Sequence, residues 1–178
     1  PAIADILFGD YNPNGVLPYS YPQYTGDFMP YDHGVLAEIQ QLTPGNITYG
    51  GYKPQWPFGF GLSYTTFEYA DLQLDREILG EGETLKASVE VRNTGKMDGL
   101  HAVDLYVSDL FASLSPAARK LRDFRKVFVA AGEAVTVEFE LDTDDLTFVN
   151  ADLERVVEPG EFRITVGKLS QTFSYRPE

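Results

Sequence analysis

The sequence predicts a mainly β protein whose larger part is a β-sandwich. From about residue 67 onward, short runs alternate apolar and polar residues, which is typical of strands with one buried face. Turn-forming residues separate these runs at the spacing that two packed antiparallel sheets require. The preceding stretch, residues 22–57, shows neither a strand period nor a helix period. We therefore expect a short helix, turn and strand, then a long connecting loop, then the sandwich.

The N-terminal segment predicts the end of a helix followed by a reversal of the chain. Residues 2–8 are apolar apart from Asp5, and they stop at Gly9, the residue type that best takes the left-handed conformation after a helix. Asn12-Pro13-Asn14-Gly15 is a strong turn signal. Residues 16–21 are short and interrupted by proline, which favours an edge strand or an extended exit from a domain.

The sandwich is predicted from four alternating runs that should share one core. Their inward residues are Leu85, Ala87, Val89 and Val91; Val103, Leu105 and Val107; Val135, Val137, Phe139 and Leu141; and Phe162, Ile164 and Val166. Turns are expected at residues 93–95, 131–133 and 158–160, and weaker strands at 69–74, 126–129 and 171–175. Burial of a large side chain contributes about 1.5 to 3 kcal/mol, so this core could fold by itself.

Composition excludes several classes of function. The 178 residues carry 27 acidic and 14 basic side chains, a net charge of −13, which disfavours binding to nucleic acid. No apolar run is long enough to cross a membrane, so no membrane partner is expected. Cysteine is absent, which excludes thiolate metal sites and disulfides. The chain starts at Pro1 inside a helical pattern, and we expect a fragment or a processed product.

Two sequence blocks closely resemble the C-terminal region of glycoside hydrolase family 3. The stretch ADILFGDYNPNGVLPYSYP, residues 4–22, is similar to the end of that family's α/β sandwich domain, and PFGFGLSYTTFEY, residues 57–69, to the entry into its fibronectin type III-like domain. LYVSD at 105–109, KLRDFRKVFVAAGE at 120–133 and VVEPGEFRITVG at 156–167 resemble later strands of that domain.

The resemblance implies three parts: a remnant of the α/β domain at 1–22, a connector at 23–64 and a fibronectin type III-like or immunoglobulin-like sandwich at 65–178. It also implies a retaining β-glycosidase, most simply a β-glucosidase that hydrolyses terminal β-glucosyl residues, whose nucleophile and acid/base carboxylates lie outside this chain. The chain alone should be inactive, with the remaining catalytic domains as its partner and a glucoside or oligosaccharide reached through them. No catalytic residue is assigned. The residues of the structural motif are Gly9, Asp10, Asn12, Pro13, Gly15, Pro18, Gly59, Gly61 and Tyr64.

An aromatic cluster in and after the connector is the candidate contact to substrate. It contains Tyr49, Tyr52, Trp56, Phe58, Phe60 and Tyr64. Flat apolar rings could stack on a sugar at the rim of an active site, and Trp56 and Tyr52 are the preferred candidates. The alternative is packing between domains, which aromatic clusters serve more often.

Other candidates have simpler interpretations. His33 and His101 stand apart from ligand partners, and the aspartates at 142, 144 and 145 lack the spacing of a calcium loop, so neither metal nor cofactor is expected. Gly59 and Gly61 indicate close backbone packing rather than phosphate binding. A basic cluster at 119–126 could guard a sheet edge or grip an acidic neighbouring domain.

Two alternatives stay open. The chain could be a free-standing sandwich that binds carbohydrate or protein without catalysis, or one product of proteolytic nicking still bound to its missing part. A periplasmic or secreted location is favoured, and a cytoplasmic one is not excluded.

Overall fold

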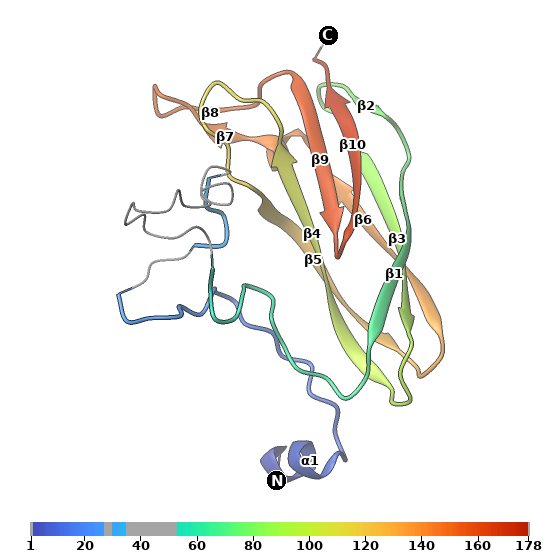
Figure 1. The fold of residues 1–178 in the computed structure, drawn as a ribbon. Helices are drawn as coiled ribbons and strands as arrows, with labels where there is room; N and C mark the ends of the chain where they lie inside the picture. Colours follow the sequence, from blue (N-terminus) through green and yellow to red (C-terminus); the bar gives the residue numbers. More distant parts are fainter. Residues whose placement is uncertain (1, 27–29, 35–52, 178) are drawn as a thin grey trace, which may run out of the picture.

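The computed structural model describes residues 2–26, 30–34 and 53–177, and it shows a β-sandwich with an N-terminal arm that lies against one of its sheets (Figure 1). The arm begins with α1 (Ala2–Phe8) at one end of the molecule, while the C-terminus lies at the opposite end. The sandwich strands are β1 (Phe67–Leu74), β2 (Ile78–Leu79), β3 (Leu85–Asn93), β4 (Gly99–Asp109), β5 (Lys120–Val129), β6 (Ala134–Leu141), β9 (Gly160–Val166) and β10 (Leu169–Tyr175).

The strands form two facing sheets with mainly antiparallel pairing. One sheet has the order β1-β3-β6 and the other has the order β2-β10-β9-β4-β5, in which only β2 pairs parallel to its neighbour. A short 3-10 helix, η1 (Thr143–Leu146), and the hairpin of β7 (Phe148–Val149) and β8 (Arg155–Val156) cap one end of the sandwich. The predicted mainly β sandwich is therefore confirmed.

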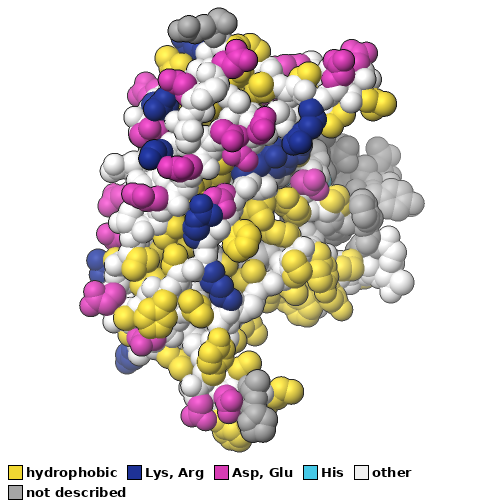
Figure 2. Space-filling view, turned by 180° about the vertical axis from the view of Figure 1, so that it is seen from behind, with side chains coloured by type: hydrophobic (Ala, Val, Ile, Leu, Met, Phe, Trp, Pro, Cys, Tyr) yellow, Lys and Arg dark blue, Asp and Glu magenta, His cyan; other side chains and the backbone are white. Residues whose placement is uncertain are grey.

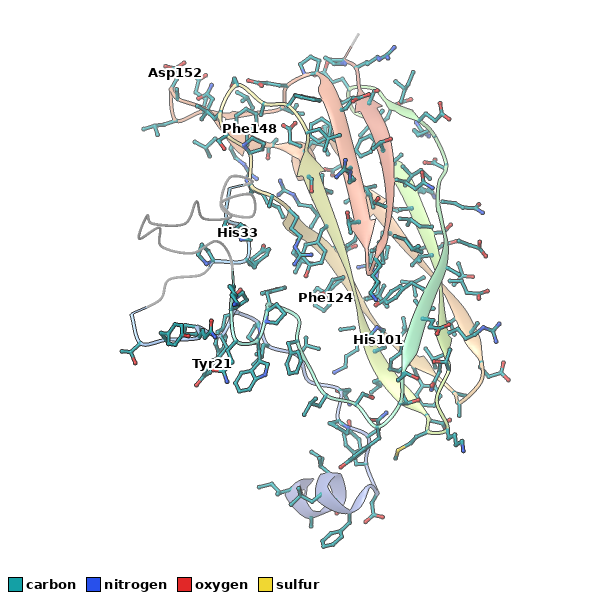
Figure 3. All side chains as sticks on the ribbon, viewed as in Figure 1. Tyr21, His33, His101, Phe124, Phe148 and Asp152 are labelled. Carbon is teal, nitrogen blue, oxygen red and sulfur yellow. The ribbon has the colours of Figure 1, made fainter. Side chains whose placement is uncertain are left out.

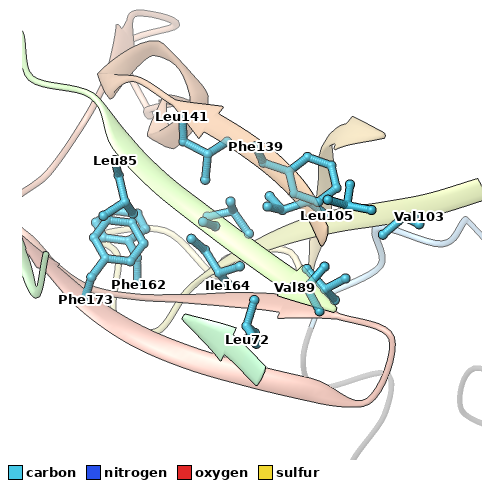
Figure 4. Packing of buried hydrophobic residues seen from close by; sticks show 14 of the residues in the cluster. Leu72, Leu85, Val89, Val103, Leu105, Phe139, Leu141, Phe162, Ile164 and Phe173 are labelled. Atoms are coloured by element: carbon cyan, nitrogen blue, oxygen red, sulfur yellow. The ribbon is translucent and has the colours of Figure 1, made fainter. Parts of the chain in front are cut away.

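The core lies between the two sheets and is built by the predicted alternation. Val89 on β3, Leu105 on β4, Phe139 on β6 and Ile164 on β9 are fully buried in one apolar cluster (Figure 4). Their sequence neighbours face outward, as the two-residue period of a strand requires. The four predicted runs therefore share one core, as expected.

The weaker strands were also predicted correctly in place but not always in length. The strand expected at 126–129 is the end of β5, which starts six residues earlier, at Lys120. Charged residues fill that first half because β5 is the last strand of its sheet, and its outer edge faces away from the core. The basic cluster thus lies along a sheet edge.

The N-terminal arm departs from the expectation at one point. Helix α1 ends as predicted, with Gly9 at a φ of +83°. The reversal expected at Asn12–Gly15 is wrong: residues 12–17 contain no turn, and neither Asn14 nor Gly15 has a positive φ. The side chain of Asn12 is used instead for contacts with the sandwich, which hold this stretch extended.

Within the described residues, no helix is long and apolar enough to cross a membrane.

Candidate functional site

Asn12 fixes the N-terminal arm to the sandwich. Its side chain is buried, and its Oδ1 accepts hydrogen bonds from the backbone N of Tyr64 (2.9 Å) and the Oγ of Ser63 (3.0 Å). Its Nδ2 donates to the carbonyl of Asp98, in the loop before β4 (3.1 Å). The Tyr64 hydroxyl in turn donates to the carbonyl of Ile6 in α1 (2.7 Å). One amide therefore ties the arm, the connector exit and the sandwich together.

Beyond this anchor, the arm and the connector exit form a two-stranded ribbon. Leu17 N donates to Phe60 O (2.8 Å), and Gly59 N donates to Leu17 O (2.9 Å). Further along, Tyr21 and Trp56 form an antiparallel bridge in which Tyr21 N donates to Trp56 O (2.8 Å). The sequence blocks at residues 4–22 and 57–69 are thus hydrogen-bonded to each other.

Glycine allows the two halves of this ribbon to approach closely. A Cβ at Gly61 would lie 2.5 Å from the carbonyl oxygen of Gly15, which no side chain could tolerate. Gly59 has a φ of +79°, a conformation that L-residues rarely adopt. Close backbone packing is therefore present at Gly61, whereas Gly59 is distinguished by its positive φ.

The ribbon carries a row of partly exposed rings on its outer side. Tyr21 contacts Trp56 edge to face with ring centroids 5.0 Å apart, Trp56 stacks with Phe60 at 6.2 Å, and Tyr19 lies 6.2 Å from Tyr21. All four rings are between 37% and 50% exposed. We call Tyr19, Tyr21, Trp56 and Phe60 the aromatic ribbon. Tyr21 is labelled in Figure 3, on the side of the arm that faces away from the sandwich.

A second group of rings holds the ribbon on the sandwich. Tyr31 stacks on Phe58 (4.3 Å) and lies edge-on to Tyr106 of β4 (6.4 Å). The guanidinium of Arg119 lies 4.8 Å above the Tyr106 ring, and the Tyr106 hydroxyl donates to Asp104 Oδ2 (3.2 Å). Burial raises the pKa values of the Asp104 carboxyl and the Tyr106 phenol.

The alternation of side chains along β4 makes this contact possible. Leu105 and Tyr106 are consecutive, so their side chains are buried on opposite faces of the strand. The pairing with β5 slips at this point and skips Arg122 of β5. Leu105 enters the core, whereas Tyr106 lies outside it, against Tyr31.

The helix at the start of the arm presents an open apolar face. Ile3, Leu7 and Phe8 are 76%, 72% and 84% exposed, while Ile6 is half-buried. Figure 2 shows hydrophobic atoms gathered over the lower half of the face opposite to that in Figure 1, whereas charged groups dominate its upper half.

The remaining sequence candidates have ordinary structural roles. His33 Nδ1 lies 3.0 Å from the carbonyl of Pro30, and the His101 ring stacks on Phe67 (4.2 Å). Asp142 caps η1 by accepting hydrogen bonds from the backbone N of Asp144 and Asp145. Among the described residues, no three His, Cys, Asp or Glu side chains gather as metal ligands would.

The aromatic residues that the sequence predicts as one cluster make different contacts in the structure. Trp56 and Phe60 lie in the aromatic ribbon, Phe58 turns toward the sandwich, and Tyr64 bonds to α1. Tyr49 and Tyr52 lie outside the described residues. Sequence reasoning missed Tyr19, Tyr21 and Tyr31. Their link to the cluster depends on contacts between residues far apart in the sequence, Tyr21 with Trp56 and Tyr31 with Phe58.

Chemically, the described residues of this surface can stack and pack, but no two carboxylates are paired among them. Flat rings with exposed edges suit a sugar ring or the apolar surface of another domain.

Family comparisons match both parts of the chain. Residues 1–64 match the glycosyl hydrolase family 3 C-terminal domain, and residues 101–170 match the fibronectin type III-like domain. A β-xylosidase of Formosa agariphila is 40% identical over 170 residues, covering 96% of this chain and 23% of that protein. A periplasmic β-glucosidase of Salmonella typhimurium is 38% identical, covering 93% of this chain and 22% of its own length.

Solved structures agree with the sequence matches. A β-glucosidase from Erythrobacter marinus superposes with a TM-score of 0.88 at 36% identity, covering 98% of this chain and 23% of that one. A β-glucosidase from Listeria innocua in complex with gluconolactone gives a TM-score of 0.86 at 33% identity, covering 97% of this chain and 26% of that one. The chain therefore spans about a quarter of the length of the relatives that it matches.

Proposed function

Because the chain belongs to glycoside hydrolase family 3 and is the C-terminal portion of such enzymes, we propose that it buttresses the catalytic domains of a retaining β-glycosidase. The activity we propose for the whole enzyme is hydrolysis of terminal β-glucosyl residues from glucosides or oligosaccharides. In a retaining mechanism one carboxylate attacks the anomeric carbon while a second carboxylic acid protonates the leaving oxygen, with the two groups about 5 to 5.5 Å apart. In this proposal both carboxylates come from the other domains, and this chain alone has no activity.

The observation that carries the proposal is the open face of α1. Asn12 and Tyr64 hold the arm firmly against the sandwich, yet Ile3, Leu7 and Phe8 on the adjoining helix contact little. A seven-residue helix is too short to be stable by itself in water, so its apolar face needs a covering surface. We assign that surface to the remainder of the α/β domain, with the chain divided at 1–22, 23–64 and 65–178 as the sequence suggests.

A matched pair of substitutions tests this assignment. Phe8→Asp should lower the melting temperature of the full-length enzyme by several degrees, because it places a charge in the proposed interface. Phe111→Asp is the control, since Phe111 is 76% exposed in the loop that follows β4. Neither change should alter the melting temperature of the isolated chain appreciably. Equal melting temperatures for the two full-length variants would contradict the proposed interface.

The aromatic ribbon gives the proposal a second part, a contact to substrate. Trp56 is 38% exposed and is held in place between Tyr21 and Phe60. We propose that its ring borders the sugar site of the assembled enzyme.

Trp56→Ala in the full-length enzyme should therefore raise KM for a disaccharide several-fold more than for an aryl glucoside, because stacking beyond the scissile bond is lost. Phe111→Ala should leave both values unchanged. A kinetic profile of Trp56→Ala identical to that of the parent would place Trp56 in domain packing only.

For location we propose the periplasm or the exterior of the cell. Its support is that one relative is described as periplasmic. Fractionation of the native host, followed by detection of the protein, would test it.

A further inference from the structure

A cavity at the capped end of the sandwich lies apart from the aromatic ribbon. It has a volume of about 280 Å³ and is lined by the end of β4, the loop at 112–117, the first half of β5, η1 with β7, and Phe162 of β9. No residue of the aromatic ribbon lines it. Phe148, one of the lining residues, is labelled in Figure 3 beside the β7–β8 hairpin.

The floor of the cavity is apolar and consists of core residues. Val107, Leu146 and Phe162 are lining residues that are almost completely buried in the core. Phe148 is half-buried, and Val149 and Leu114 are substantially exposed at the same cavity. A ring and two aliphatic side chains therefore offer flat apolar contacts to a ligand.

The polar lining is balanced between donors and acceptors. Lys120 and Arg122 supply cationic donors, while Asp109 and Asp145 supply carboxylate acceptors, so the formal charges cancel. Burial lowers the pKa of the Arg122 guanidinium and raises the pKa values of Asp109 and Asp145.

Three of these groups, Arg122, Asp109 and Asp145, have polar atoms without a hydrogen-bond partner in the described part of the chain. Arg122 Nη2 donates to Thr147 O (3.1 Å), but its Nε is buried and has no acceptor among the described residues. Asp109 uses Oδ1 for the backbone N of Phe111 (3.1 Å), and Asp145 uses Oδ2 for the backbone N of Asp142 (3.1 Å). The second oxygen of each carboxylate accepts no hydrogen bond within the described part of the chain.

We propose that this cavity binds one neutral sugar residue, as a site separate from catalysis. An anionic ligand would meet two carboxylates, and a cationic ligand would meet a lysine and an arginine. A hydroxyl group both donates and accepts, so a neutral polyhydroxy ligand satisfies both kinds of lining group at once. The apolar face of a pyranose ring would lie against Phe148 and Val149. Only the choice of glucose and xylose units as ligands rests on the proposed function.

Binding to the 178-residue chain itself tests the proposal. Isothermal titration with glucose, cellobiose and xylobiose should give saturable binding at one site with Kd around the millimolar range, about 1 mM in order of magnitude. Glucuronate and glucosamine should bind at least about 5-fold more weakly than glucose, because each introduces a charge that the lining opposes. Absence of saturable binding by all three neutral sugars would overturn the proposal, as would tighter binding of glucuronate.

Variants locate the site. Lys120→Met and Phe148→Ala should each weaken binding about 10-fold or more, after circular dichroism has confirmed that both remain folded. The matched controls Lys86→Met, on the other sheet, and Phe111→Ala should bind as the parent does, and so should Trp56→Ala. Loss of binding in Trp56→Ala but not in Phe148→Ala would overturn the proposal by placing the sugar on the aromatic ribbon. Because no step of this test involves catalysis or α1, its failure would leave the Phe8→Asp comparison unaffected.

Discussion

At the scale of single residues, His101 shows how burial makes stability depend on pH. Its ring stacks on Phe67 and its Nε2 lies 2.7 Å from the Tyr69 hydroxyl, on the side of β4 that faces the other sheet. Burial lowers the pKa of the His101 imidazole below its ordinary value and raises the pKa of the Tyr69 phenol to about 12. The folded state therefore holds a neutral histidine next to a neutral phenol.

The sign of the effect follows from linkage. Below about pH 6.5 the unfolded chain gains a proton at this histidine before the folded chain does, so its contribution to stability is lost as the pH falls. The free energy of unfolding of the parent minus that of His101→Phe should therefore be smaller at pH 5.0 than at pH 7.5. Urea unfolding at both pH values measures this difference. Because the parent and His101→Phe carry the same carboxylates, the contribution of the carboxylates to the pH dependence cancels. A difference that did not change with pH would contradict a neutral buried His101.

Asn12 marks the limit of reading turns from sequence. Asn-Pro-Asn-Gly favours a reversal locally, yet the three hydrogen bonds of the Asn12 side chain go to residues 51 or more positions away. Tertiary contacts of this kind override a local preference, and no pattern within the segment announces them. The same holds for Tyr31 and Tyr106, whose contact joins the connector to β4.

At the scale of elements, the strands could be predicted because their period is local. Alternation in β3, β4, β6 and β9 fixes which side chains enter the core, and these were the runs with the clearest pattern. Periodicity could not predict the charged first half of β5 or the two-stranded ribbon of the arm and the connector exit. The strands there are set by their hydrogen-bonding partners, which the local pattern does not reveal.

The ribbon depends on the close approach at Gly61. Gly61→Ala would place a Cβ against the carbonyl oxygen of Gly15 and should open the pairing of Leu17 with Gly59 and Phe60. Trp56 is the single tryptophan of the chain, so its fluorescence reports on the ribbon. Emission should shift to longer wavelength in Gly61→Ala as the indole becomes more exposed.

Gly15→Ala is the matched control, because a Cβ at Gly15 would meet nothing within 4 Å and its φ is not positive. Identical spectra for the two variants would show that Gly61 does not hold the ribbon closed.

At the scale of the whole molecule, the sandwich buries its apolar residues while the arm leaves several of its own exposed. The core is closed between two sheets, and its rings and aliphatic side chains are fully buried. The arm ends in a helix whose apolar face is open. The chain matches about a quarter of the length of a β-xylosidase and a β-glucosidase, which is consistent with this asymmetry.

Hydrogen exchange compared between the isolated chain and the full-length enzyme tests the central claim most directly. The amides of α1 and of residues 9–11 should exchange rapidly in the isolated chain and become protected at least about 100-fold in the full-length enzyme, because a covering domain suppresses local opening. The amides of β3 and β9 should be strongly protected in both. Equal exchange of α1 in the two proteins would contradict an interface at this helix and with it the role of the chain as a buttress.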